Sequence, residues 1–405
     1  MRVLIYALLS VFLGSLTTAG PIPIVLAAQN SAILAATPPM GWSTWNHYAH
    51  DISDKLIREQ ADAMVSSGMR DAGYIYVHID GGWQGQRDDK GVLHPLPTFP
   101  DMRALGDYIH SKGLKFGLYS GPGPVSCAGA ETSYGHEEQD AQMFANWGVD
   151  YLKYDLCSYR LIMQIESAGD VAKSEAMMRA AYEKMHQAIL KTGRPMVFSL
   201  CQYGLGEVWE WGPQVGGTMW RTSNDINDTY ERMMSIADRQ SGLSQFAGPG
   251  HWNDPDFLEV GNGGMSFEEQ KSHFSLWALM AAPLMAGNDL TRMSDETRTI
   301  LLNREVIAVD QDPLGRAGDR VWQRGPLEVW ARPLRDGAVA VGLFNQLTSA
   351  THVTVNLRDI GIHEDAEAED LWTHSSLGVL HGSYTAVVPG HGVVMLRVRP
   401  STNHL

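Results

Sequence analysis

Two aspartates stand at the ends of strand-like runs, Asp155 after Tyr-Leu-Lys-Tyr and Asp225 after Trp-Arg-Thr-Ser-Asn. Cleaving an acetal through an oxocarbenium-like state requires one carboxylate near the anomeric carbon and one carboxylic acid near the departing oxygen. A single Asp after an apolar run is also a common turn or N-cap residue. The same placement recurs at Asp80, Asp254 and Asp256, however. The sequence therefore predicts that several carboxyl groups meet on one rim and hydrolyse a glycoside.

The elements that would position these groups alternate between short β-like runs and amphipathic helical runs from about residue 37 to residue 312. This alternation is typical of a parallel sheet with crossover helices. We expect eight strands, at residues 40–45, 74–80, 115–120, 151–155, 196–201, 219–223, 250–254 and 281–286. Helices are expected at residues 53–67, 102–111, 137–147, 173–192 and 228–239, and after Ser266, where Ser-Phe-Glu-Glu forms a capping box. Eight such strands predict a closed barrel, in which working groups lie at the C-terminal strand ends.

The pattern changes after about residue 313. Residues 327–331, 339–343 and 352–356 alternate with period two and are separated by turn residues. We therefore expect an α/β fold in which a (β/α)8 TIM barrel over residues 33–312 is followed by a C-terminal antiparallel β-sandwich domain over residues 313–405. The second domain carries no obvious catalytic cluster, so support of the barrel is favoured over sugar binding.

Composition narrows the function further. The chain has 405 residues, 44% of them hydrophobic, and a net charge of −15, which argues against nucleic acid and is compatible with a neutral oligosaccharide or polysaccharide. Residues 1–28 have the pattern of a signal peptide, with Arg2, an apolar stretch and a small-residue cleavage site. A retained membrane anchor is the alternative, but Pro21 and Pro23 interrupt the apolar run. We expect a secreted or periplasmic protein without an anchor, and a homo-oligomer remains open.

Three cysteines suit an oxidising compartment if two of them pair. Cys127 and Cys157 both lie just beyond strand-like segments, so a bridge between neighbouring loops would stiffen the rim and leave Cys201 free. Neither a Cys-x-x-Cys motif nor a Cys/His spacing accompanies them, and the histidines are not spaced as metal ligands. We expect no metal and no cofactor.

Four motifs occur in order: Pro-Pro-Met-Gly-Trp-Ser-Thr-Trp-Asn at 38–46, Tyr-Leu-Lys-Tyr-Asp-Leu-Cys at 151–157, Trp-Arg-Thr-Ser-Asn-Asp-Ile at 220–226 and Trp-Asn-Asp-Pro-Asp at 252–256. With them the chain resembles glycoside hydrolase family 27, the melibiase-like α-galactosidases and α-N-acetylgalactosaminidases. The resemblance implies a retaining exo-glycosidase that acts on terminal α-D-galactosyl residues by double displacement. It also implies Asp155 as nucleophile and Asp225 as acid/base.

The resemblance implies substrate contacts as well. Trp45 would form a wall beneath the sugar, hydroxyl binders would follow several strands, and Arg221 would contact the sugar near its 2-position. The substrate-binding set is Trp45, Asp80, Tyr119, Cys127, Lys153, Gln202, Arg221 and Asp256. A Cys127–Cys157 disulfide is also what the family predicts. Bulky Gln202 and Leu205 would crowd an acetamido group, which favours a free 2-hydroxyl.

Strand geometry supports two of these assignments independently. Lys153 precedes Asp155 by two residues, so both side chains should point toward the barrel axis. We expect the ammonium group to keep Asp155 ionised. Arg221 should remain near Asp225 across a strand-to-loop turn. An ionised Asp155 beside a protonated Asp225 predicts a bell-shaped pH–rate profile.

One position departs from the family pattern. Family members with α-galactosidase activity usually carry two adjacent aspartates where this chain has Asp80-Gly81. The missing carboxylate normally holds the region of the axial 4-hydroxyl, and losing a charged hydrogen bond costs roughly 1.5–3 kcal/mol unless a loop such as residues 87–90 replaces it. The same machinery acting on an α-glucan linkage, a β-L-arabinopyranoside or an α-N-acetylgalactosaminide is therefore a rival. A non-hydrolytic sugar-binding protein is a weaker one, since it needs no paired acid and base.

Overall fold

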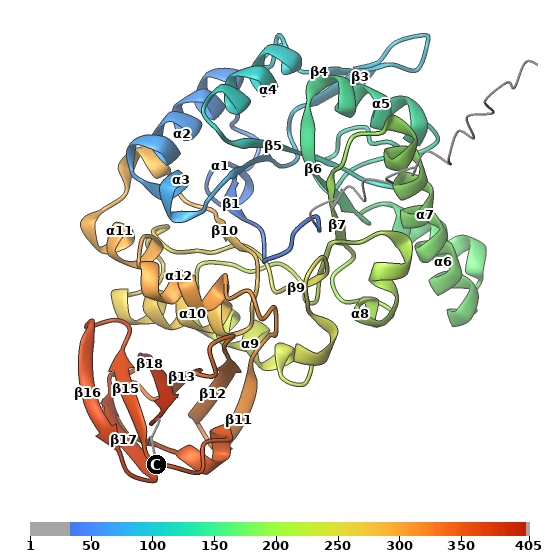
Figure 1. The fold of residues 1–405 in the computed structure, drawn as a ribbon. Helices are drawn as coiled ribbons and strands as arrows, with labels where there is room; N and C mark the ends of the chain where they lie inside the picture. The colour runs from blue at the N-terminus through green and yellow to red at the C-terminus, as the bar shows by residue number, and fades with distance from the viewer. Residues whose placement is uncertain (1–32, 402–405) are drawn as a thin grey trace, which may run out of the picture. The chain divides into compact units, whose positions relative to one another are not determined.

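The computed structural model describes residues 33–401, and its N-terminal part is a single parallel sheet of eight strands (Figure 1). The order across the sheet is β10-β1-β2-β5-β6-β7-β8-β9. These strands are β1 (Met40–Ser43), β2 (Tyr76–Ile79), β5 (Lys115–Ser120), β6 (Val149–Asp155), β7 (Val197–Cys201), β8 (Met219–Arg221), β9 (Trp252–Asp254) and β10 (Leu284–Ala286). Each lies within or overlaps a predicted run, so the eight expected strands are confirmed.

The sheet closes through a segment just beyond β9. The amide of Leu258 donates to the carbonyl of Met285 at 2.8 Å, and the amide of Gly287 donates to the carbonyl of Leu258 at 3.0 Å. These two bonds pair the end of the sheet with β10, at the opposite edge. The closure confirms the TIM barrel and leaves neither edge of the sheet unpaired there.

Helices surround this sheet in the order expected for crossover connections. Those predicted are α2 (Asp54–Ser66), α4 (Met102–Ser111), α5 (Glu137–Trp147), α7 (Val171–Thr192), α9 (Tyr230–Gln240) and α10 (Phe267–Leu279). The capping box of α10 is present, with Ser266 and Glu269 each accepting the other's backbone N–H. Those not predicted are α1 (Trp45–Tyr48), α3 (Met69–Ala72), α6 (Tyr159–Ser167), α8 (Val208–Trp211), α11 (Asp295–Leu301) and α12 (Arg304–Asp310).

Some connections also form structure that the sequence patterns did not indicate. A two-stranded hairpin of β3 (Gln84–Arg87) and β4 (Leu93–Pro95) follows β2. Short 3-10 helices occur at Gly212–Val215, Ser244–Phe246, Leu290–Arg292 and Leu357–Ile360. Trp45, predicted to end the first strand, instead begins α1, the short helix that follows the C-terminal end of β1.

The C-terminal part is a β-sandwich, as expected. A six-stranded antiparallel sheet has the order β11-β12-β13-β18-β15-β16, and β14 pairs with β17 in a second sheet. The strands are β11 (Asp319–Arg324), β12 (Leu327–Pro333), β13 (Val339–Asn345), β14 (Thr351–Asn356), β15 (Ala366–Asp370), β16 (Ser375–Leu380), β17 (Ser383–Val388) and β18 (Val393–Pro400). Val329, Val341 and Leu343 from the larger sheet pack with Val353 and Val388 from the smaller one. The two sheets therefore share a core.

The other face of the six-stranded sheet packs on the barrel. Because strand side chains alternate, Trp330 points away from Val329 and joins the barrel's hydrophobic core. Arg332 donates to the carbonyl of Ala278 in α10 at 2.7 Å, and the indole of Trp372 donates to Ser275 of α10 at 3.0 Å. Figure 1 shows the sandwich lying against α10 and α12.

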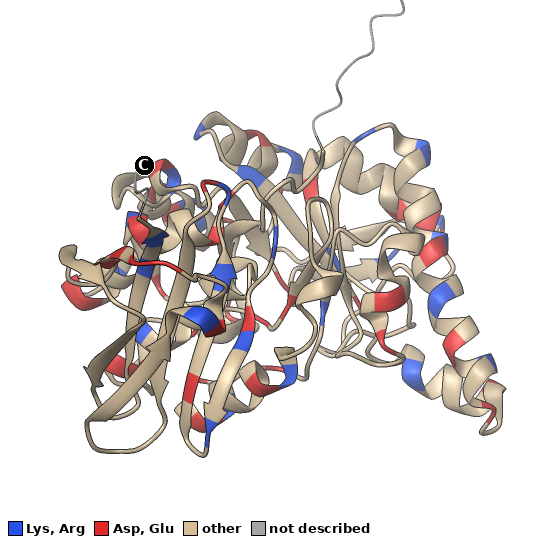
Figure 2. Ribbon diagram, turned by 60° about the horizontal axis from the view of Figure 1, so that its bottom comes forward, with Lys and Arg blue, Asp and Glu red and all other residues tan. Residues whose placement is uncertain are grey.

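The helices and the surface charges bear on the expectations about membranes and partners. Within residues 33–401 no helix combines the length and apolar character needed to cross a membrane. Acidic and basic residues are interspersed over the outer helices and the C-terminal strands (Figure 2). The predicted signal peptide, residues 1–28, lies outside the described residues.

Candidate active site

A cavity of about 430 Å³ opens at the C-terminal ends of the barrel strands. Its walls come from seven of the eight strand ends or the loops that follow them. The lining residues are Trp45, Asn46, Asp80, Gly81, Tyr119, Cys127, Ala128, Lys153, Asp155, Tyr203, Arg221, Asp225, Asp256 and Phe257. The structure thus brings together the two predicted catalytic aspartates and seven of the eight predicted substrate-binding residues.

Asp155, the last residue of β6, is 5% exposed and is held by two tyrosines. Tyr203 donates to its Oδ1 at 2.7 Å, and Tyr119 donates to its Oδ2 at 3.1 Å. Burial raises the pKa of Asp155, while the positive charge of Lys153 and the hydrogen bond from Tyr203 oppose that rise. The carboxylate is therefore fixed in orientation and titrates above the ordinary range of an aspartate.

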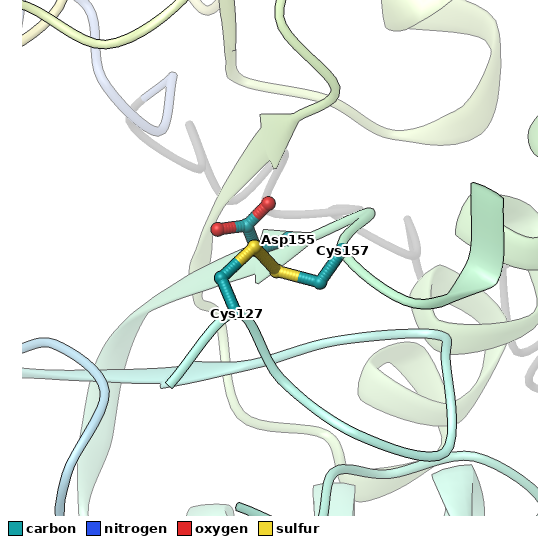
Figure 3. Close-up of side chains that lie close together, drawn as sticks. All are labelled: Cys127, Asp155 and Cys157. Carbon is teal, nitrogen blue, oxygen red and sulfur yellow. A yellow bond between two sulfur atoms is a disulfide. The ribbon is translucent and has the colours of Figure 1, made fainter. Parts of the chain in front are cut away.

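The disulfide between Cys127 and Cys157 lies directly beside this carboxylate. Figure 3 shows the Asp155 side chain next to the two bonded sulfur atoms, which lie within 4.8 Å of one of its oxygens. Within residues 33–401, Cys127, Asp155 and Cys157 are the one group of three or more metal-ligand residue types that lie close together. The two cysteines are bonded to each other, so neither offers a thiolate to a metal. The group stiffens the rim around Asp155.

Lys153 bonds to a different carboxylate from the one expected. Its Nζ lies 2.8 Å from Oδ2 of Asp80, and both side chains are buried. Burial opposes charge on Asp80, but Lys153 and His78 outweigh it and lower the pKa of that carboxyl. The positive charge of Lys153 favours ionised Asp155, as expected, but burial outweighs it, so the pKa of Asp155 is raised overall. Lys153 and Asp80 form a buried ion pair in the cavity wall.

Arg221 joins Asp225 to Asp256. One guanidinium nitrogen lies 3.1 Å from Asp225 and 2.8 Å from Asp256. The Asp225 side chain is 66% exposed, whereas Asp256 is 4% exposed and has a backbone φ of 104°. Burial raises the pKa of Asp256 to about 6, against the opposing charge of Arg221. Asp225 therefore stands at the mouth of the cavity, where a leaving group would depart, and Asp155 stands inside it.

Gln202 is the predicted contact that the cavity does not include. It is fully buried, and neither polar atom of its side chain has a hydrogen-bond partner in the described part of the chain. The chain turns at the next residue, Tyr203, which has a φ of 64° and enters the cavity instead. Sequence analysis missed Tyr203, Asn46 and Phe257 as cavity residues. The adjacent motif Trp-Asn at 45–46 was the available signal for Asn46.

Gly81 leaves a corner of the wall without a side chain. A Cβ atom there would lie 3.1 Å from the Cβ of Ala128 and 3.7 Å from the rings of Trp45 and Tyr119. The hypothesis that residues 87–90 replace the missing carboxylate is wrong for Arg87, which pairs with Asp140 at 2.6 Å and points away from the cavity. This corner is therefore apolar.

Fold and site together define a class: a TIM-barrel glycoside hydrolase with four carboxyl groups, Asp155 and Asp225 among them, lining one cavity. A family model described as "Alpha galactosidase A" matches residues 37–312, and one described as "Alpha galactosidase C-terminal beta sandwich domain" matches residues 324–398. The chain belongs to glycoside hydrolase family 27, the melibiase-like α-galactosidase family, and is a glycoside hydrolase.

Individual proteins show the same relationship. An α-galactosidase of Cyamopsis tetragonoloba is 46% identical over 373 residues, which cover 91% of this chain and 87% of the relative. The crystal structure of α-galactosidase I from Mortierella vinacea superposes with a TM-score of 0.86 at 37% identity, covering 92% of this chain and 99% of that one. The Saccharomyces cerevisiae α-galactosidase with raffinose gives a TM-score of 0.81 at 28% identity, over 91% and 98% of the two chains.

Proposed function

We propose that this enzyme is a retaining, exo-acting α-galactosidase in which Asp155 is the nucleophile and Asp225 the acid/base. The observation that supports this most directly is the contrast between the two carboxyl groups on one cavity. Asp155 is buried and oriented by two tyrosines, and Asp225 is exposed at the mouth beside Arg221. A nucleophile needs a fixed direction of attack, and an acid/base needs access to the leaving group and to water.

The reaction follows from this placement. An oxygen of ionised Asp155 attacks the anomeric carbon while the bond to the aglycone oxygen breaks, and Asp225 gives that oxygen its proton. The product of this step is a β-linked galactosyl ester of Asp155 and a free alcohol. Asp225, now a carboxylate, takes a proton from water as the water oxygen attacks the anomeric carbon and the ester bond breaks. The sugar leaves with its α-configuration, and both aspartates return to their initial states.

The remaining lining residues would bind the sugar. Asp80 and Lys153 form a buried ion pair in the cavity wall and would hold sugar hydroxyls. Trp45, Tyr119 and Phe257 offer aromatic walls, while Arg221 and Asp256 are placed for the 2-position and its neighbour. Four carboxyl groups line the cavity with only two cations, a balance that favours a developing positive charge on the sugar ring. This lining suits one terminal residue of an oligosaccharide or polysaccharide, such as raffinose.

Three tests decide the proposal, two on the wild-type enzyme and one on a variant. The first is turnover of nitrophenyl α-galactoside, α-N-acetylgalactosaminide, α-glucoside and β-L-arabinopyranoside, of which the α-galactoside should be preferred. The second is proton NMR of the first-formed sugar, which should be the α-anomer. Asp155→Asn should abolish turnover and keep sugar binding. An inverted product, or unchanged turnover by Asp155→Asn, would refute the mechanism.

The second candidate is the same mechanism on another glycoside, and Gly81 is the observation that favours it. Its corner carries no charged group to hold a sugar hydroxyl. Preference for one of the other three sugars in the panel would select this candidate.

Export and the role of the C-terminal domain complete the proposal. We infer that residues 1–28 are a signal peptide and that the mature protein is secreted or periplasmic, without a membrane anchor. The Cys127–Cys157 disulfide supports this, because disulfides persist in oxidising compartments. The sandwich would support the barrel through α10. Amino-terminal sequencing of the exported protein tests the cleavage, and light scattering reports whether it is a homo-oligomer.

A further inference from the structure

Behind the cavity wall, Glu259 is a buried carboxyl group that the mechanism above does not use. It is 4% exposed and lies in the loop between β9 and α10. Asn46 donates to its Oε1 at 2.6 Å, and Asn262 donates to its Oε2 at 2.5 Å. Both oxygens are thus bonded to side-chain amides, and Glu259 takes part in none of the ion pairs formed by residues 33–401. A buried carboxylate held by neutral donors alone is unusual.

The charged and titratable groups around Glu259 do not neutralise it. Asp256 and Asp228 are acidic neighbours, and their charges disfavour a further anion. From α10, the ring of His273 accepts the backbone N–H of Glu259 at 3.1 Å, and burial lowers the pKa of that histidine to about 3. From α1, His47 reaches only the far side of Asn262, at 3.1 Å. Burial therefore raises the pKa of Glu259 to about 7, although the two amide hydrogen bonds oppose the shift.

Asn46 connects this carboxyl group to the sugar site. It lines the cavity next to Trp45. On the other side it is packed against Gly287, where an added Cβ would lie 3.0 Å from the Cβ of Asn46. The side chain is therefore confined. Its amide has two orientations, which differ in whether Oδ1 or Nδ2 faces the cavity. A carboxylate only accepts hydrogen bonds, whereas a carboxylic acid also donates one.

We propose that Glu259 is a positioning residue that sets the orientation of the Asn46 amide in the cavity wall. When Glu259 is ionised, Asn46 must give it Nδ2 and turns Oδ1 toward the sugar, as an acceptor for a hydroxyl. When Glu259 is protonated, its O–H donates to Oδ1 of Asn46, and Nδ2 turns toward the sugar as a donor. This inference deepens the proposed function, on which it rests, by assigning part of the recognition of sugar hydroxyls to a pair that changes with pH.

The consequence is a pH dependence of KM near neutrality that is separate from the pH dependence of kcat. One neutral hydrogen bond to a hydroxyl changes affinity about 2- to 10-fold. KM for nitrophenyl α-galactoside should therefore change by about that factor between pH 5.5 and 8.5. In Glu259→Gln, which cannot ionise, the change of KM around pH 7 should disappear, and only the change that follows Asp256 near pH 6 should remain. The matched control is Glu231→Gln, at an exposed glutamate of α9, which should keep the wild-type dependence.

A second variant keeps the inference testable if Glu259→Gln does not fold. Asn46→Ala should also lose the pH dependence of KM, although Glu259 is still present, and Glu259→Gln should add nothing to it. A merely structural role for Glu259 would lower the melting temperature and leave the pH dependence of KM as in the wild type. That result in either variant would overturn the inference. Absence of turnover by the wild-type enzyme would instead count against the proposed function, and the same series would then use the glycoside that the enzyme does hydrolyse.

Discussion

The hydroxyl of Tyr203 donates a 2.7 Å hydrogen bond to Oδ1 of Asp155, from a loop that neither carries a motif nor belongs to a strand. Arg160 of α6 packs over the ring of Tyr203 with its guanidinium carbon 4.2 Å from the ring centre. Arg160 thus contacts one side of Tyr203, while the hydroxyl of Tyr203 bonds Asp155. Its hydrogen bond opposes the rise of the pKa of Asp155 that burial causes.

Tyr203→Phe should lower kcat/KM and move the acidic limb of the pH–rate profile upward. Asp155 must be ionised to attack, so activity falls as the pH drops through its raised pKa, and losing the hydrogen bond raises that pKa further. A hydrogen bond to a charged group contributes about 1.5–3 kcal/mol, which predicts a loss of about 10- to 150-fold. Tyr119→Phe is the matched control, because its bond of 3.1 Å to the same carboxylate is longer and should matter less. An unmoved acidic limb in Tyr203→Phe would show that the bond does not tune the nucleophile.

Asp225→Asn should lower the rate of hydrolysis most for substrates whose leaving groups must be protonated. General acid catalysis contributes about 10²- to 10⁴-fold, so alkyl and sugar aglycones should lose that much. A dinitrophenyl galactoside, whose phenolate leaves without protonation, should react much faster than these. Added azide attacks the galactosyl ester without a base and should give α-galactosyl azide. Equal losses for all aglycones would mean that Asp225 is not the acid.

The sequence indicated the scaffold well because buried parallel strands have a clear signature. β5, for example, is a short apolar run bounded by polar residues, and its predicted and observed bounds coincide. Closure of the barrel was expected from the strand count alone. The contact that achieves it uses the main chain of Leu258, outside any strand, and main-chain bonds leave no trace in residue type.

The site was predictable in its residue types but not in its pairings. Strand periodicity correctly predicted that Lys153 and Asp155 point into the same cavity. It could not predict which carboxylate Lys153 would bond. The pairing depends on how far Lys153 in β6 lies from Asp80, which follows β2. The curvature of the barrel sets that distance. For a similar reason the sequence predicted Gln202 as a cavity residue, whereas Tyr203 lies there instead. The positive φ of Tyr203 decides which of the two enters the cavity, and no sequence pattern reports it.

Gly81→Asp should raise kcat/KM for an α-galactoside by about 10-fold or more, since a charged acceptor contributes about 1.5–3 kcal/mol when it bonds a sugar hydroxyl. The substitution places a carboxylate in the apolar corner between Trp45, Tyr119 and Ala128. Gly81→Ala is the matched control: its methyl group meets Ala128 at 3.1 Å and brings no acceptor, so kcat/KM should not rise. A fall in activity with Gly81→Asp would indicate that the corner is occupied by part of the natural substrate.

Replacing Cys127 and Cys157 by serine should lower the free energy of unfolding by about 3.6 kcal/mol, the chain-entropy value for a closed loop of 30 residues. Urea denaturation measures this loss. Because the bridge lies beside Asp155, kcat should fall as well. A reducing agent should affect the wild type in the same way and leave the double variant unchanged. Retention of full stability after confirmed reduction would contradict a structural role for the bridge.

Stability should also depend on pH through Asp310, which is fully buried where α12 ends. Burial raises the pKa of Asp310 to about 8, against the opposing charge of Arg332, while the pKa in an unfolded chain is about 3.9. Between these values the folded protein holds a proton that the unfolded chain has released, so stability falls as the pH rises toward and through about 8. Asp310→Asn removes the ionisation and should flatten the decline of the melting temperature between pH 6 and 9 by at least about 2 °C. Asp89→Asn, at an exposed site, should decline as the wild type does. Parallel curves for Asp310→Asn and the wild type would mean that Asp310 is ionised in the folded enzyme throughout.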